Sequence, residues 1–356
     1  MEIEVYDYIS PQNHFNLNKN LIESLAGIGK VKVVANQGYY SVSEINLENV
    51  SFVELQLTKF KNSMLGRKLN ALFAMIKTRK QFNKYSDSFK IIFTFDTVAF
   101  GLGRYSLNLN ELFLMHHKNI DELKDPIKRL IFKSYMNKVN HIVFEEIFKT
   151  YLVKEIGVHE NRVFVVPHPV FNQAKSKNFL EKYDCVGLSN SNDDEFIRKI
   201  IEIERASCFT KRNNLHIVLR SKLYQFDNGF LKVISGFLQK CDYDDYINSS
   251  KLVFVPLPQT YNYRVSGAIF DAFSNHKFVV ANNVPIVEEY KKRYPKICIG
   301  INNVDDFFNV VVENKNNSNK DTNSFKDFID DHSRLIIRKR FKEAFVRVEK
   351  DEDKKK

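Results

Sequence analysis

The sequence of 356 residues contains no tryptophan, only four cysteines and no GxGxxG motif. The cysteines, at 185, 208, 241 and 298, form no CxxC pair, which argues against a zinc site or a disulfide framework and suits a reducing compartment. No apolar run approaches the roughly 20 residues that cross a bilayer. The opening residues MEIEVYDYIS lack the basic and apolar regions of a signal peptide, so we expect a cytoplasmic protein.

The composition is that of a globular protein with a basic surface. Hydrophobic residues make up 44% of the chain and charged residues 27%, and the formal net charge is +11. This length favours two domains over one. The positive excess suits nucleic acid, an anionic membrane surface or an anionic substrate, and composition alone does not choose among them.

Short apolar runs alternate with helical patterns along two successive stretches of the chain, which is typical of doubly wound α/β sheets. The first stretch begins strand, helix, strand, but without the glycine-rich dinucleotide fingerprint. A polar, lysine-rich segment separates the two stretches. The pattern predicts a first domain at 1–171, a linker at 172–183, a second domain at 184–324, a charged helix at 325–349 that packs back on the first domain, and a disordered tail at 350–356.

The segment from 246 to 290 predicts an anion site. An apolar strand at 252–255 is followed by a polar loop and by a helix that begins at Ser266, Gly267 and Ala268, with Ser266 as the expected N-cap. A helix N-terminus that follows the carboxyl end of a strand offers unpaired N–H groups and the positive end of a dipole. A diphosphate is the kind of anion that this arrangement suits.

Candidate catalytic residues follow the strands of the first stretch. Asp96 ends a strand at 90–95, and the pair His116-His117 ends a strand at 112–115. Asn13 and His14 lie in the loop after the first strand. The carboxyl ends of parallel strands carry the chemistry of such sheets, although two histidines could also simply face solvent. The glycines at 101 and 103 indicate a turn or a helix interruption.

The segment at 59–84 is a basic amphipathic helix by pattern, with eight basic residues and no acidic one. One interpretation is a surface helix with one face packed on the sheet. The other is a peripheral contact with an anionic membrane, in which basic side chains meet lipid head groups.

The order of these segments resembles that of GT-B glycosyltransferases, most closely glycosyltransferase family 4. The resemblance rests on LFLMHHKN and VFVVPHPV in the first half, and on DYINSSKLVFVPLP, SGAIFDAF and KFVVANNVPIVEE in the second. The family usually has two glutamates separated by seven intervening residues. Asp271 matches the second of them, whereas Tyr263 stands at the first, and Arg220 stands where a glycine is usual.

The resemblance implies two Rossmann-like domains that face each other across a cleft, with a nucleotide-sugar donor on the second. It implies that Asp271 binds the ribose hydroxyls and that no cofactor or metal is needed; the Asp242-Tyr243-Asp244 run indicates a helix or turn start. The donor-binding candidates are Ser189, Arg220, Lys222, Tyr246, Arg264, Ser266, Gly267, Ala268 and Asp271. His116, His117 and Asp96 are the catalytic candidates, and His14 and Asn13 are the acceptor-binding ones.

The expected activity is transfer of a hexose, with retention of configuration, from a nucleotide-diphosphate sugar to a glycan or lipid-linked acceptor in surface polysaccharide or glycoconjugate synthesis. This places the protein in the cytoplasm, peripherally at the inner face of the cell membrane. The alternatives are a GT-B nucleotide-sugar epimerase and a basic nucleic-acid-binding protein. No nucleic-acid partner is expected, because much of the excess charge lies in one amphipathic segment without a known reader motif.

Overall fold

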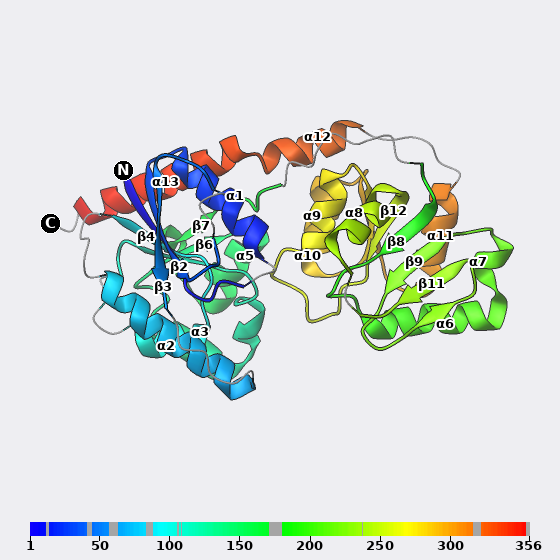
Figure 1. Cartoon of the computed structure of the whole chain (residues 1–356), viewed down its shortest axis with the longest axis horizontal. Coiled ribbons are helices and arrows are strands. Elements are labelled where there is room, and N and C mark those ends of the chain that lie inside the picture. The colour runs from blue at the N-terminus through cyan, green and yellow to red at the C-terminus, as the bar shows by residue number, and fades with distance from the viewer. Residues whose placement is uncertain are drawn as a thin grey trace. The chain divides into compact units, whose positions relative to one another are not determined.

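The chain forms two compact α/β units, shown in Figure 1. The computed structural model describes residues 1–11, 14–40, 45–56, 63–82, 88–104, 107, 109–170, 180–236, 238–315 and 322–353. The first unit comprises Met1–Pro169, Tyr263–Val265 and His332–Lys356, and the second comprises Val170–Asn262 and Ser266–Asp331. The domain boundary therefore falls close to the predicted linker, but two later segments return to the first unit.

The sheet of the first unit has the order β3-β2-β1-β4-β5-β6-β7, and its neighbouring strands pair in parallel. Every residue of β4, β5 and β6 is buried, as expected for strands covered on both faces. Helices α1 and α13 lie on one side of the sheet, and α2 and α3 lie on the other (Figure 1). The strands are β1 (Glu2–Asp7), β2 (Lys30–Asn36), β3 (Val50–Leu55), β4 (Phe89–Ile92), β5 (Leu112–Met115), β6 (Asn140–Val143) and β7 (Val163–Val165).

The helices of the first unit follow these strands in the alternation that the sequence predicts. They are α1 (Phe15–Ala26), α2 (Met64–Phe82), α3 (Thr97–Gly103), η2 (Asp121–Lys124), α4 (Pro126–Lys133), α5 (Glu146–Tyr151), η3 (Leu152–Ile156), η4 (Glu160–Arg162) and α13 (Arg334–Asp353). The basic segment at 59–84 is helical over 64–82, and its outer residues 59–62, 83 and 84 lie outside the described ranges.

The sheet of the second unit has the order β10-β11-β9-β8-β12-β13-β14. Its neighbours pair in parallel, except that β10 is antiparallel to β11. The prediction of two doubly wound sheets is thus confirmed, and the short edge strand β10 is an addition to it. The strands are β8 (Tyr183–Gly187), β9 (Ile217–Arg220), β10 (Phe226–Asp227), β11 (Leu231–Ile234), β12 (Ser250–Val255), β13 (Phe278–Asn282) and β14 (Cys298–Ile301).

Two helical layers cover this second sheet. One face packs the apolar sides of α6 and α11 onto the strands, with Ile197, Ile200 and Phe307 fully buried. The other face carries α8, α9 and α10, where Phe273, Tyr290 and other aromatic rings cluster (Figure 1). The helices are α6 (Asp194–Ser207), α7 (Phe209–Arg212), α8 (Lys240–Asn248), α9 (Gly267–Ser274), α10 (Pro285–Arg293), α11 (Val304–Lys315) and α12 (Thr322–Asp331).

The single helix predicted at 325–349 is two helices that belong to different units. Helix α12 ends at Asp331 in the second unit, and α13 begins at Arg334 in the first. Between them His332 is buried, and its Nδ1 donates a hydrogen bond to the carbonyl oxygen of His168 at 2.9 Å. A tertiary hydrogen bond therefore divides a helical pattern that is continuous in the sequence. The tail expected to be disordered from 350 is helical up to Asp353, and 354–356 lie outside the described ranges.

The glycines at 101 and 103 mark close packing rather than a turn. Both lie in α3. A Cβ at Gly101 would lie 2.3 Å from a methyl carbon of Ile131 on α4, and one at Gly103 would lie 2.8 Å from Met75 Cγ on α2. The absence of side chains lets both neighbouring helices approach α3. Among the described helices, none is long and apolar enough to cross a membrane.

Candidate functional site

The centre of the second unit is the carboxyl end of β8, because the strand order reverses between β8 and β12. Gly187 ends β8, where a Cβ would lie 2.9 Å from the carbonyl oxygen of Phe254 on β12. Asn192 in the following loop donates hydrogen bonds to the carbonyl oxygens of Gly187 and Arg220, each at 2.9 Å. The loop is therefore held over the sheet edge where open α/β sheets bind ligands.

Three of the predicted donor-binding residues lie around this loop. Ser189 is half-buried in the loop itself, where its Oγ accepts a hydrogen bond from the backbone N–H of Ser191 at 3.1 Å. Arg220 follows β9 and donates from Nε to the carbonyl oxygen of Gly236 at 2.8 Å. Lys222 is exposed two residues further on. The structure thus brings two cations to the carboxyl edge of this sheet.

The position of Lys222 is fixed by Asp194, a residue that the sequence analysis did not single out. Asp194 Oδ1 accepts from the backbone N–H of Lys222 at 2.8 Å and from Ser221 Oγ at 2.5 Å. This carboxylate holds the loop after β9 against the start of α6, so that the lysine side chain stays exposed. In the sequence, Asp194 is only an acidic residue in the first turn of a predicted helix. Such residues are too common for the sequence to show that this one holds a loop.

The helix predicted to bind an anion begins where expected. Helix α9 starts at Gly267, its N-cap is Ser266, and Ala268 is the second helical residue. The predicted N-cap position is thus confirmed, although within the described structure the hydroxyl of Ser266 makes no capping hydrogen bond. Gly267 is exposed and a Cβ there would meet nothing within 4 Å. The start of α9 is therefore open to solvent at Gly267, whereas Ser266 and Ile269 beside it are buried.

Asp271 lies one turn into α9 and is held by a tyrosine from α8. The hydroxyl of Tyr243 donates to Asp271 Oδ2 at 3.1 Å. Burial raises the pKa of Asp271 to about 6, and the hydrogen bond from Tyr243 opposes that rise. Tyr243 is the middle residue of the Asp-Tyr-Asp run, which lies inside α8 as a helical segment. Among the described residues, no three histidine, cysteine or acidic side chains are grouped to hold a metal ion.

The structure does not bring Tyr246 to this group. Tyr246 lies one turn after Tyr243 on α8, and its ring lies 5.3 Å from that of Tyr183, the first residue of β8. It therefore lies toward the amino ends of the strands, whereas Ser189, Arg220 and Gly267 lie at the carboxyl ends.

Arg264 belongs to the first unit rather than to the unit predicted to bind the donor. Its Nε lies 3.1 Å from Asp121 Oδ2, and the neighbouring Tyr263 donates its backbone N–H to Asp121 Oδ1 at 2.8 Å. The ring of Tyr263 stacks on Tyr151 with centroids 4.0 Å apart. Asp121 pairs with the Arg264 guanidinium, so the cations for a diphosphate are better sought at Arg220 and Lys222.

The first unit has its own change of strand order, between β1 and β4. Asp7 ends β1 with none of its surface exposed and accepts hydrogen bonds from Asn18 Nδ2 and Tyr40 Oη, each at 2.8 Å. Burial raises the pKa of Asp7 to about 6, and these hydrogen bonds oppose the rise. The surrounding groups therefore enclose this carboxylate.

The two adjacent histidines after β5 have different surroundings. His116 is buried, and its Nε2 lies 2.9 Å from Nδ1 of His141, whose own Nε2 donates to the carbonyl oxygen of Met136. His116 must therefore donate its Nε2 proton to His141. Burial holds the pKa of His116 well below 6.5, with the neighbouring His141 as a smaller cause. His116 is thus a neutral core histidine rather than a solvent-facing one.

His117 is half-buried and lies beside His14. Its Nε2 donates to the carbonyl oxygen of Phe93 at 2.8 Å, which leaves Nδ1 as a hydrogen-bond acceptor. The rings of His117 and His14 lie 4.3 Å apart. Burial lowers the pKa of His14 to about 4, with Lys118 as a second cause, and burial also holds the pKa of His117 well below 6.5. Both rings are neutral near pH 7. Asn13, the other predicted acceptor residue, lies outside the described ranges.

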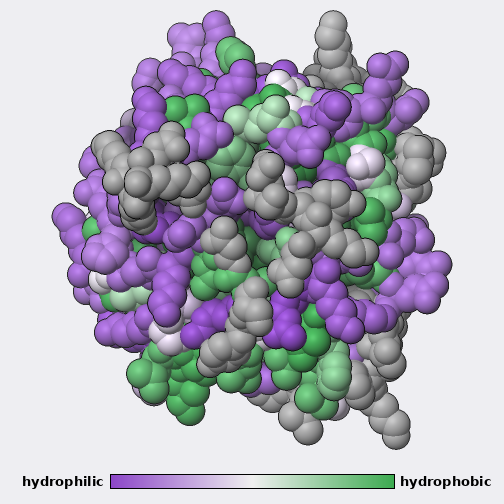
Figure 2. Space-filling model, turned by 90° about the vertical axis from the view of Figure 1, so that its left-hand side faces the viewer, coloured by the Kyte–Doolittle hydropathy of each residue, from purple (hydrophilic) through white to green (hydrophobic). Residues whose placement is uncertain are grey.

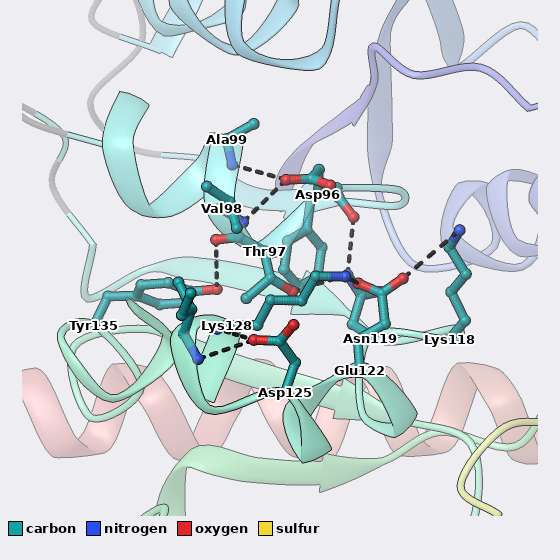
Figure 3. A network of polar contacts seen from close by, with 12 residues as sticks. Asp96, Thr97, Val98, Ala99, Lys118, Asn119, Glu122, Asp125, Lys128 and Tyr135 are labelled. Atoms are coloured by element: carbon teal, nitrogen blue, oxygen red, sulfur yellow. Dashed lines mark hydrogen bonds and ion pairs between the residues drawn. The ribbon is translucent and has the colours of Figure 1, made fainter. Parts of the chain in front are cut away.

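Asp96 acts structurally, as Figure 3 shows. It is the N-cap of α3, and its Oδ1 accepts hydrogen bonds from the backbone N–H groups of Val98 and Ala99 at 3.0 and 2.9 Å. Asn119 ties the same region together by donating to the carbonyl oxygen of Phe95 at 2.9 Å. The carboxylate that was predicted to be catalytic therefore caps the N-terminus of α3.

Comparison with solved structures decides the fold, whereas the chain matches no protein-family model and no curated protein at a significant level. The Anabaena protein Alr3699/HepE in complex with UDP and glucose aligns with 97% of this chain and 99% of its own, with a TM-score of 0.64 and 12% identity. The chain has the GT-B glycosyltransferase fold.

Other GT-B structures agree over nearly the whole chain. The lipopolysaccharide outer core galactosyltransferase WaaB aligns with 97% of this chain and 99% of its own, with a TM-score of 0.58 and 12% identity. Sucrose-phosphate synthase from Thermosynechococcus elongatus aligns with 98% of this chain and 94% of its own, with a TM-score of 0.58 and 11% identity. The GT-B resemblance read from the sequence is thus confirmed, and the order of both sheets follows that fold.

Proposed function

We propose that this protein is a glycosyltransferase that uses a nucleotide-diphosphate sugar, with UDP-glucose as the first donor to test. The single observation that carries the proposal is the edge of the second unit, where the loop after β8, two cations and the open start of α9 lie at the carboxyl ends of the strands. The GT-B fold supports it, and the similar HepE structure holds UDP and glucose.

The donor diphosphate is assigned to the first turn of α9. Three features favour an anion there: the backbone N–H groups of Gly267 and Ala268 at the helix start, the positive end of the helix dipole, and the absence of a side chain at Gly267. Arg220 or Lys222 supplies the positive charge that stabilises the leaving diphosphate. In this proposal Asp271 accepts hydrogen bonds from the ribose hydroxyls, as the family resemblance implies.

A role of Asp271 in ribose binding predicts a pH dependence of donor affinity. The pKa of Asp271 is raised to about 6, so the carboxylate is ionised above that pH and protonated below it. We expect affinity for UDP-glucose to rise roughly tenfold from about pH 5 to about pH 7, because an ionised acceptor binds hydroxyls more strongly. Isothermal titration calorimetry would measure this. UDP-glucose is the right probe because its diphosphate, unlike that of UDP, does not titrate in this range.

Two variants separate this effect from other titrating groups. Asp271→Asn should flatten the pH profile. Tyr243→Phe removes the hydrogen bond that lowers the pKa of Asp271, so the midpoint should move to higher pH. An unchanged midpoint in Tyr243→Phe, or an unchanged profile in Asp271→Asn, would remove Asp271 from the ribose site.

Transfer with retention of configuration is the stereochemistry that the first unit favours. An inverting enzyme needs a placed base of suitable pKa. Asp7 is enclosed by its hydrogen-bond partners, Asp96 caps a helix, and the pKa values of His14 and His117 are lowered. His117 is better suited to accept a hydrogen bond at Nδ1 from a sugar hydroxyl than to remove its proton.

The decisive experiment is a thermal-shift panel of UDP, GDP, ADP and CDP, followed by turnover of the matching sugar nucleotide. We expect UDP alone to stabilise the protein by several degrees, since a ligand at a hundred times its dissociation constant stabilises by about 2.7 kcal/mol. Stabilisation by none of the four would contradict the proposal. Release of nucleotide from the sugar donor without any acceptor would favour the epimerase alternative.

A further inference from the structure

Three helices of the first unit, α2, α3 and α4, make one continuous surface, here called the helical face. The close contacts of Gly101 with α4 and of Gly103 with α2 join the helices side by side. Leu102 lies between the two glycines, and 54% of its surface is exposed. The packing that brings the helices together therefore leaves a leucine side chain in solvent.

Large hydrophobic side chains gather on the helical face. Of the ten exposed side chains of this kind among the described residues, four lie here, whereas the others are dispersed over the chain. They are Phe73 on α2, 50% exposed, Leu102 on α3, 54%, and Ile127 and Leu130 on α4, 68% and 71%. Figure 2 shows hydrophobic atoms beside strongly hydrophilic ones along its lower edge, the side on which Figure 1 places α2 and α3. A gathering of this kind marks an interaction surface.

The same face is strongly basic. Helix α2 has five basic residues and no acidic one, and α4 has three and none. The backbone N–H of Lys128 lowers the pKa of Asp125, the N-cap of α4, and Lys68 of α2 adds a smaller electrostatic effect, so Lys68 lies near the start of α4. The nearby acid Glu122 is already neutralised by Lys128 at 2.9 Å (Figure 3). The exposed lysines and arginines therefore dominate the local field.

We propose that the helical face binds an anionic lipid bilayer, with the four hydrophobic side chains in the head-group region and the basic side chains on lipid phosphates. This combination suits a membrane surface because both the apolar and the cationic groups gain contacts there. A nucleic acid would use the charges but would leave the aliphatic side chains in water. The binding needs no sugar nucleotide, so it stands independently of the proposed function.

The location of the helical face adds a consequence that does rest on the proposed function. Four residues separate α3 from the carboxyl end of β4, and α4 follows the carboxyl end of β5 after His116, His117 and η2. A bilayer on this face would therefore lie beside the carboxyl edge of the first sheet, where His14 and His117 meet. A sugar acceptor carried on a lipid could reach this edge without leaving the membrane.

The test is co-sedimentation of the full chain with vesicles of phosphatidylcholine alone or mixed with phosphatidylglycerol. We expect binding to the mixed vesicles only, weakened by salt. Lys68→Gln, Lys80→Gln and Lys133→Gln together should reduce the partition coefficient roughly fivefold per lysine. Leu102→Ser with Leu130→Ser should reduce it by about tenfold, because less apolar surface is buried.

A matched control comes from α13, which is also basic and also carries an exposed leucine. Leu335 is 74% exposed, close to the 71% of Leu130, so Leu335→Ser removes a comparable side chain from another helix and should leave vesicle binding unchanged. Equal loss in Leu335→Ser, or full binding in the Leu102 and Leu130 double variant, would overturn the assignment. If the protein bound a DNA duplex as tightly as the mixed vesicles or more tightly, the partner of the helical face would be a nucleic acid and not a membrane.

The same variants keep this proposal distinct from the donor site. Stabilisation of each variant by UDP, measured without vesicles, should equal that of the wild-type chain. Vesicle binding without any response to nucleotides would contradict the proposed function alone, and a nucleotide response without vesicle binding would contradict the membrane proposal alone.

Discussion

Replacing Gly267 with aspartate is expected to reduce affinity for UDP at least a hundredfold without unfolding the protein. The new carboxylate would stand in the first turn of α9, where the diphosphate is proposed to bind. Two unit charges of like sign at roughly 5 Å repel by about 3 kcal/mol at an effective dielectric constant of about 20, which is about a hundredfold in affinity. Isothermal titration calorimetry with UDP measures the loss.

The fold should tolerate this substitution, which makes the result specific. A Cβ at position 267 meets nothing within 4 Å, and an acidic residue near a helix N-terminus stabilises the helix by about 0.3–1 kcal/mol. The melting temperature should therefore stay the same or rise slightly. Gly267→Ala is the matched control, since it adds a Cβ without charge and should keep UDP affinity within a few-fold. Undiminished affinity in Gly267→Asp would show that the anion binds elsewhere.

Exchanging His117 for alanine is expected to lower kcat/KM at least a hundredfold with UDP affinity unchanged. The side chain offers a free acceptor at Nδ1 while Nε2 is fixed on the carbonyl oxygen of Phe93, so it can hold a sugar hydroxyl in one orientation. Loss of a group that positions the reacting hydroxyl costs on the order of a hundredfold. His117→Asn keeps an acceptor near the Nδ1 position and should recover part of the rate. Steady-state kinetics with the donor identified by the nucleotide panel measures both variants.

The neighbouring His116 should behave in the opposite way. His116→Ala removes a buried ring that is hydrogen-bonded to His141, so the free energy of unfolding should fall by about 3 kcal/mol. The rate per folded molecule should change little, because the ring contacts the core and not the sheet edge. Urea unfolding and active-site titration separate the two quantities. A large rate loss with normal stability in His116→Ala would reverse the roles given to the two histidines.

These two residues show where sequence reasoning reached its limit. The order of apolar runs placed both histidines at the carboxyl end of a strand, which is correct. Consecutive residues in extended backbone point to opposite sides. Which of the two enters the core depends on His141 and Phe132, which come from later segments of the chain. No local pattern contains that information.

Three polar residues also show the difference between what the sequence predicted and what the structure decided. Asp96 was a reasonable catalytic candidate because it follows a strand, but the helix that begins after it uses its carboxylate as a cap. Arg264 was assigned to the donor, yet its segment lies in the first unit beside Asp121. Tyr243, one turn before the predicted Tyr246, is the tyrosine that reaches Asp271. The partners of Arg264 and Tyr243 are distant in the sequence, whereas Asp96 caps the helix that begins at the next residue.

The sequence by itself determined the two alternating α/β halves, the division near residue 170 and the helix start at Ser266 and Gly267. Hydrophobic periodicity and glycine placement are local properties, and burial of the resulting apolar faces leaves few ways to stack such elements. Only the tertiary structure decided which histidine is available, which tyrosine supports Asp271, where α12 and α13 separate, and that α2, α3 and α4 share one basic, apolar face. Those outcomes depend on contacts between distant segments, which form only when the chain is packed.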